Sequence, residues 1–201
     1  MADSSNFLST IRNVALTPFL LVALAWGGSV PAQTEETRTL ELDGGAAVTY
    51  TVHRLPPDAH LRRPASELAP TSALNAAMLL NLHLSTGDIE EAALLSNAPR
   101  RRFEVLREYR DSVGAEEFKR VFASYFYPQN RPIAEIAIGR HRLIIWELKD
   151  SAGQVSPQFA HLAGQYFVEV DGRYFIDDVP NDTRTRLRWV LEAYRAAKAP
   201  R

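Results

Sequence analysis

The spacing of hydrophobic positions changes along the chain, and the first pattern is that of strands. Residues 37–55 (TRTLELDGGAAVTYTVHRL) alternate between apolar and polar side chains on both sides of Asp43-Gly44-Gly45. This arrangement predicts a β-hairpin with a tight turn. Residues 56–70 contain four prolines and predict a loop that links the hairpin to the rest of the chain.

From Thr71 the apolar spacing becomes that of helices. Residues 73–84 are rich in alanine and leucine and are apolar over most of the helical circumference, which predicts a helix buried on several sides. Thr71 or Ser72 is expected to cap its start, and Gly87 is suited to the left-handed residue after its end. Further helices are predicted within residues 88–96, 100–113 and 115–126.

The segment HLSTGDIEEAALLS (residues 83–96) combines a histidine with three carboxylates, which raises the question of a metal site. Asp88 is placed to cap a helix, and Glu91 stands three residues later, as in a capping box. Glu90 and Glu91 also favour the positive end of the helix dipole. The pattern therefore indicates a helix junction, and we predict no metal site.

The second half of the chain predicts two more hairpins and a final helix. Residues 133–149 turn at Gly139-Arg140, and residues 158–179 turn at Asp171-Gly172. Asp182 is expected to cap a helix over residues 183–198. Together the patterns predict an α+β fold, with helices packed on a curved, cone-like antiparallel sheet, an N-terminal β-hairpin and a C-terminal helix.

The first 32 residues have the composition of a secretory signal peptide. Arg12 precedes an apolar run over residues 14–26, and Val30 and Ala32 are small enough for positions −3 and −1 of a cleavage site. We expect cleavage near Ala32 and a periplasmic or secreted mature protein, without stable membrane insertion once cleaved. An uncleaved membrane anchor is the alternative. The expected organisation is residues 1–32 as signal, 33–70 as hairpin and linker, and 71–201 as the α+β domain.

Composition excludes several kinds of chemistry. The 201 residues contain no cysteine, which excludes disulfides, thiolate metal sites and cysteine nucleophiles. A formal net charge of −1 gives no footprint for nucleic acid. The five histidines are scattered without metal-ligand spacing, and no phosphate-binding glycine loop is present. We expect neither a metal nor another cofactor.

Two stretches carry a resemblance to a known superfamily. LLNLHLSTGDIEEAALLS looks like the opening helices, and HLAGQYFVEVDGRYFIDDV like the final hairpin, of the nuclear-transport-factor-2-like (cystatin-like cone) superfamily. The resemblance covers residues 71–179 and implies a cone-shaped cavity between sheet and helices. The superfamily includes isomerases, cyclases and dehydratases as well as domains without chemistry, so the resemblance implies a pocket and no particular activity.

Strand parity suggests which residues line that cavity. In residues 161–170, the set that contains Leu162, Gly164 and Tyr166 is expected to face the helices. Phe167, together with Trp146, is expected on the outer face of the sheet, where a homodimer would form. The expected ligand-binding residues are apolar or tyrosine side chains: Met78, Leu82, Phe118, Phe122, Tyr166 and Tyr174.

The leading hypothesis is an exported, non-catalytic binding protein for a small apolar ligand or a protein partner, using the cavity or the sheet surface. The alternatives are an isomerase, dehydratase or hydrolase of the same fold, or an inhibitor or immunity-type protein that acts by surface contact. The catalytic candidates are Tyr166, Tyr174 and an aspartate, either Asp177 or Asp178, which could polarise a carbonyl and transfer a proton. His83 is a further candidate, although a buried, hydrogen-bonded histidine without chemistry is the commoner case.

Overall fold

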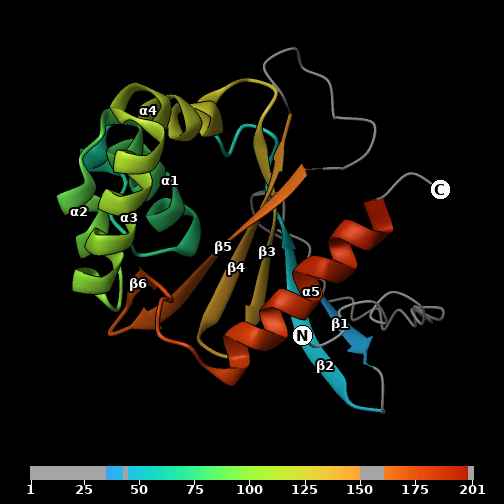
Figure 1. Cartoon of the computed structure of the whole chain (residues 1–201). Helices are drawn as coiled ribbons and strands as arrows, with labels where there is room; N and C mark the ends of the chain where they lie inside the picture. Colours follow the sequence, from blue (N-terminus) through green and yellow to red (C-terminus); the bar gives the residue numbers. More distant parts are fainter. Residues whose placement is uncertain (1–34, 43–44, 150–160, 199–201) are drawn as a thin grey trace, which may run out of the picture.

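Six strands form one antiparallel sheet in which every strand pairs with its neighbours in the sequence (Figure 1). The computed structural model describes residues 35–42, 45–149 and 161–198, so the predicted signal peptide lies outside the described residues. The strands are β1 (Glu35–Glu41), β2 (Ala47–Arg54), β3 (Arg131–Ile138), β4 (His141–Leu148), β5 (His161–Val170) and β6 (Arg173–Ile176). The three predicted hairpins are therefore confirmed as β1–β2, β3–β4 and β5–β6.

The N-terminal hairpin belongs to the same sheet as the rest of the chain. β2 pairs with β3, with Thr51 opposite Ala137 and Arg54 opposite Ala134. Between them in the sequence lie the proline-rich loop and the helical segment. This pairing places a strand from the start of the described chain beside strands from its second half.

Helices cover both faces of the sheet, which confirms the predicted α+β class (Figure 1). One layer contains α1 (Ala73–Thr86), α2 (Ile89–Leu94), α3 (Pro99–Val113) and α4 (Ala115–Ala123). Among the described helices, α5 (Asp182–Lys198) alone covers the opposite face. Two short 3-10 helices, η1 (Ala65–Glu67) and η2 (Ser124–Phe126), lie in the connections.

Three helix ends are set by the residues predicted for them. The Ser72 hydroxyl accepts a hydrogen bond from the Asn75 N–H, and Gly87 ends α1 with a φ of 83°. A carboxylate oxygen of Asp88 accepts from the Glu91 N–H at 3.5 Å, as expected for a cap. The last helix is different, because Asn181 and not Asp182 is its cap: the Asn181 Oδ1 accepts the Arg184 N–H at 2.8 Å. Asp182 occupies the first helical position instead.

The sheet separates two hydrophobic cores. Ile144 and Trp146 of β4 point into the core shared with α1–α4. Leu143 and Ile145 of the same strand point into the core shared with α5. Because all four are fully buried, β4 is an inner strand of a three-layer arrangement, and residues 143–146 at its centre are a continuous apolar run.

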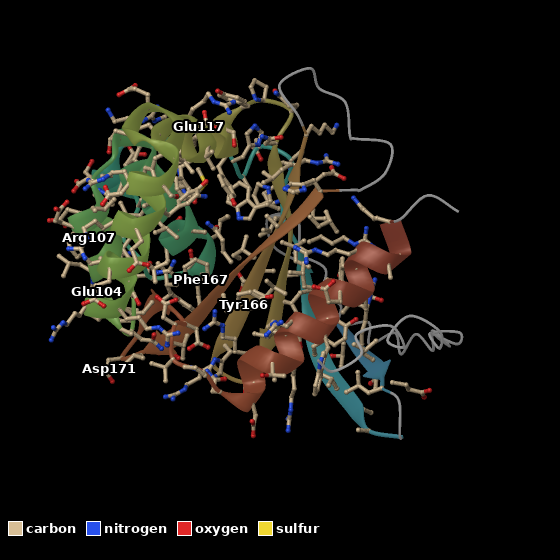
Figure 2. All side chains as sticks on the ribbon, viewed as in Figure 1. Glu104, Arg107, Glu117, Tyr166, Phe167 and Asp171 are labelled. Atoms are coloured by element: carbon tan, nitrogen blue, oxygen red, sulfur yellow. The ribbon has the colours of Figure 1, made fainter. Side chains whose placement is uncertain are left out.

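Trp146 and Phe167 correct the expectation about the sheet faces. Both side chains are 0% exposed and lie in the core beneath α1–α4, so they cannot form the predicted dimer surface. Tyr166, the neighbour of Phe167, lies in the core beneath α5 (Figure 2). The alternation of side chains in β5 was therefore predicted correctly. The assignment of the faces was wrong, because Phe167 and not Tyr166 faces the layer of α1–α4. The reason is that a second helix covers the other face, so both faces are largely apolar.

α5 packs closely on the sheet at Gly164 of β5. A Cβ atom at this position would lie 2.6 Å from Leu191 Cδ2 of α5 and 2.9 Å from Leu143 Cδ1 of β4. The two leucines thus occupy the space in which a side chain at position 164 would lie. Arg195 adds a polar contact nearby, since its guanidinium donates two hydrogen bonds to the Leu162 carbonyl oxygen.

Candidate functional site

The structure brings together five of the six predicted ligand-binding residues, but as packed side chains. Met78 and Phe118 are buried in the core beneath α1–α4, and Leu82, Phe122 and Tyr174 pack against it. The sixth, Tyr166, lies on the other side of the sheet. The predicted set therefore does not line one common cavity.

Aromatic side chains fill the space between the helical layer and the sheet. A chain of ring contacts runs from Phe118 to Phe122, on to Tyr125, and from Tyr125 to Trp146 at a centroid distance of 4.9 Å. Burial raises the pKa of Tyr125 to about 12, in keeping with its place inside this core. Two pockets on the α5 side of the sheet are lined by other residues.

A short chain of amides crosses the same interior. The Trp146 indole N–H donates to Gln165 Oε1 at 2.8 Å, and Gln165 Nε2 donates to Asn81 Oδ1, also at 2.8 Å. The Asn81 Nδ2 group is buried and has no hydrogen-bond partner among the described residues. Because the indole can only donate, the orientation of both amides follows from its position. These contacts fix α1 against β4 and β5.

The catalytic candidates are not assembled into one site. Tyr166 and Tyr174 lie on opposite sides of the sheet, and no hydrogen bond among the described residues links either hydroxyl to Asp178. Asp178 instead accepts two hydrogen bonds from the Arg102 guanidinium, at 2.7 and 2.5 Å, and one from Ser96. His83 faces Asp88, with Nδ1 3.3 Å from Oδ2, at the α1–α2 junction.

Asp177 and His141 form a pair that the sequence pattern did not reveal. The Asp177 carboxylate is 2% exposed by residue, and its Oδ2 lies 3.0 Å from His141 Nδ1. Asn97 and Asn181 each donate an amide N–H to the same carboxylate. A carboxylate that orients an imidazole occurs in hydrolase triads, but a triad also needs a nucleophile at the imidazole. Ser96, the nearest hydroxyl of this network, bonds to Asp178 instead.

The Asp177–Asp178 network therefore joins elements of the fold. Asn97 and Arg102 belong to the α2–α3 region, His141 begins β4, and Asn181 caps α5. The sequence signal for the network is the pair of aspartates that follows β6, but His141 and Asn97 lie 36 and 80 residues from Asp177. Without contact information these partners could not have been named.

Two pockets of the described residues lie on the α5 side of the sheet. One, of about 310 Å³, lies near the start of α5 and is lined by Leu42, Val48, Thr185 and Trp189 among others. The larger pocket, of about 440 Å³, lies near the end of α5. We call this larger one the basic pocket, because four of its lining residues are cationic: Arg38, Arg54, Arg131 and Lys198.

Strand register brings the basic pocket together from distant parts of the sequence. Arg38 of β1 stands opposite Tyr50, so it points to the α5 side of the sheet. Arg54 follows Val52 by two residues in β2 and shares its face. The last turn of α5 contributes Tyr194 and Lys198. The floor is apolar and contains side chains from β2, β3 and the start of the proline-rich loop: Val52, Leu55, Pro57, Pro132, Ile133 and Ala134.

Carboxylates neutralise only some of these cations. Arg38 pairs with Glu36 at 2.7 Å, while Arg131 and Lys198 share Glu147. Burial raises the pKa of Glu147, but the hydrogen bonds and charges of Lys198 and Arg131 outweigh it and hold the pKa below its usual range. Arg54 belongs to no ion pair among the described residues.

Tyr194 lies beside these charges. Burial raises the pKa of its hydroxyl, whereas Arg38 and Arg54 act in the opposite direction. The hydroxyl thus remains a neutral hydrogen-bond donor at physiological pH. The basic pocket thus combines cationic side chains, the neutral hydrogen-bond donor of Tyr194 and an apolar floor.

Two further facts concern metal ions and membranes. Within the described ranges, no group of three or more histidine, aspartate or glutamate side chains is arranged to hold a metal ion. Among the described helices, none has both the length and the apolar character needed to cross a membrane.

In comparisons with known proteins, no protein-family model, no curated protein and no solved structure matches this chain.

Proposed function

We propose that this protein is an exported, non-catalytic binding protein that holds a small ligand on the α5 side of its sheet. The observation that carries the proposal is the basic pocket beside α5. Met78, Phe118, Trp146 and Phe167 are fully buried beneath α1–α4, while the basic pocket beside α5 offers about 440 Å³. That volume is within the range of small-molecule sites.

The separation of the polar candidates supports a non-catalytic role. Acid–base chemistry requires the reacting groups to converge on one substrate position. Tyr166 and Tyr174 lie in different cores, and Asp178 is engaged by Arg102 and Ser96. The hydrogen bonds of Asp177 and Asp178 are accounted for by their role in joining the helical layer, β6 and α5.

Two further parts of the proposal rest on the sequence and the order of elements. The apolar run over residues 14–26 with small residues near Ala32 supports export. The succession of α1–α4 followed by the antiparallel meander β3–β6 supports a relationship to the nuclear-transport-factor-2-like superfamily. In this proposal the space corresponding to the superfamily's cone is occupied by side chains.

Native mass spectrometry of protein recovered from a periplasmic extract tests the proposal. A mass that corresponds to a chain beginning at Gln33, with a small molecule retained under gentle ionisation, is the expected result. A chain that retains Met1 contradicts export with cleavage. A mature chain recovered without any added mass contradicts the small-ligand role.

A further inference from the structure

We infer that the basic pocket binds an amphipathic anion, a carboxylate or phosphate group attached to an apolar body. This inference rests on the proposed function, because it specifies the ligand of the same binding protein. It goes further by assigning a chemical class and an anchoring residue. Three properties of the pocket support it: its charge, a guanidinium without an ion pair among the described residues, and its apolar floor.

Positive charge exceeds negative charge around the pocket. Four cationic side chains line it, whereas the carboxylates that pair with them are two, Glu36 and Glu147. This local excess stands against a formal net charge of −1 for the whole chain. An unbalanced group of cations beside a partly apolar hollow favours an anionic ligand.

Arg54 is the residue positioned to anchor that anion. Arg38 is held by Glu36, and Arg131 and Lys198 are held by Glu147. Lys198 also lies in the last turn of α5, where a cation complements the helix dipole. Among the described residues Arg54 has neither constraint, and it lines the same pocket as Arg38 and Tyr194. A guanidinium can bind a carboxylate or a phosphate through two parallel hydrogen bonds.

The floor of the pocket defines the rest of the ligand. Ile133 and Leu55 are half-buried and Pro57 is exposed, so these three residues present apolar surface to the pocket, while Val52 and Ala134 are buried in its wall. Inorganic phosphate alone would leave this surface in contact with water. An anion with a short alkyl or ring body would cover it and gain the free energy of apolar burial. The Tyr194 hydroxyl can donate a third hydrogen bond to the acidic group.

Isothermal titration calorimetry with defined probes tests the inference. The purified protein, in Tris-chloride without phosphate, is titrated separately with octanoate, octyl phosphate, inorganic phosphate and octyltrimethylammonium. We expect at least one of the two octyl anions to bind, and the tighter of them identifies carboxylate or phosphate as the preferred group. Inorganic phosphate and the octyl cation should bind roughly tenfold more weakly or worse, because each lacks one of the two recognised parts.

Two arginine variants locate the site. Arg54→Gln removes the charge and the paired N–H donors of the guanidinium. It should weaken binding of the octyl anion about tenfold or more, which corresponds to the loss of one charge-assisted hydrogen bond. Arg54→Lys keeps the charge without the paired N–H donors and should give an intermediate loss of affinity. Arg101→Gln, at an exposed position of α3, removes the same charge elsewhere and should leave binding unchanged. Both Arg54 variants should keep the circular dichroism spectrum of the wild type, since Arg54 is exposed at the end of β2.

Several results would overturn the inference. These are the absence of binding by either octyl anion, equal binding of the octyl cation, equal binding of inorganic phosphate, or equal losses in Arg54→Gln and Arg101→Gln. The outcome is separable from that of the proposed function. A retained molecule without an acidic group in native mass spectrometry would uphold the binding role while refuting the amphipathic anion.

Discussion

Replacing Gly164 by alanine probes how tightly α5 is packed on the sheet. The new Cβ would lie 2.6 Å from Leu191 Cδ2 and 2.9 Å from Leu143 Cδ1, whereas carbon atoms pack best at about 3.5–4.0 Å. One or both leucines must therefore move by about 1 Å within a buried core. Overpacking of this kind typically costs about 1–3 kcal/mol.

The net effect includes a smaller contribution of opposite sign. Alanine restricts the unfolded chain and returns about 0.4–1 kcal/mol where its backbone angles are compatible, as expected in the middle of β5. We expect Gly164→Ala to lower the free energy of unfolding by about 1–2 kcal/mol. Urea denaturation followed by tryptophan fluorescence measures this difference, provided that the dependence of the unfolding free energy on urea concentration is the same in both proteins.

A double variant separates overpacking from other causes. Leu191→Ala alone is expected to cost about 2–5 kcal/mol, because it leaves a cavity beneath α5. In that background the methyl group added by Gly164→Ala has space, so this substitution should become neutral or stabilising. An equal cost of Gly164→Ala with and without the Leu191 side chain would refute the reasoning, as would a stabilising effect in the wild-type background.

Three further predictions concern buried polar groups. Gln165→Met leaves the Trp146 indole N–H and the Asn81 Oδ1 unpaired and should lower the free energy of unfolding in urea by about 2–4 kcal/mol. A loss below about 0.5 kcal/mol would contradict the role of this amide chain. Tyr125 has a folded pKa of about 12 against an ordinary value of 10.0, so the folded state keeps a proton that the unfolded state loses, and stability should fall as pH rises from 10 to 12. Tyr125→Phe should flatten this alkaline loss in unfolding experiments at stepwise pH, and an unchanged slope would count against it. Burial raises the pKa of Glu135 despite Arg142, so this group favours folding more as pH falls through its folded pKa towards 4.5. Glu135→Gln should therefore be more stable than wild type near neutral pH and no more stable once pH falls below the ordinary glutamate pKa of 4.5, and a pH-independent difference would exclude this explanation.

Local chemistry made the elements of the fold predictable. Ser72, Gly87 and Asp88 act within four residues of their partners, so their roles in helix ends could be assigned from spacing alone. The tight turn at Asp171-Gly172 is likewise local, with φ values of 50° and 75° at its two residues. These signals were enough to predict the α+β class and the three hairpins.

The assignment of sheet faces required information that the alternation does not contain. In β5, Tyr166 and Phe167 are both aromatic, and each belongs to a face covered by helices (Figure 2). Periodicity separates the two sets but does not say which helix each set meets. Gln165 is polar, yet it lies in the interior, where Trp146 and Asn81 are its hydrogen-bond partners.

The basic pocket could not be predicted for a different reason. Arg38 and Lys198 are separated by almost the whole described chain, and neither stands in a motif. They become neighbours only because β1 pairs with β2, β2 with β3, and α5 returns across the sheet. Each cation by itself is typical of a solvated surface.

The position of α5 in the chain has a consequence for the order of folding. All six strands of the described sheet precede α5 in the sequence, so during synthesis the sheet face that contains Val52, Ile136 and Leu143 has no cover until this helix emerges. The layer of α1–α4 can begin to form from local contacts, while the second core depends on contacts between α5 and β3, β4 and β5. A nascent chain that lacks α5 is therefore expected to expose an apolar sheet face to chaperones until α5 has been synthesised.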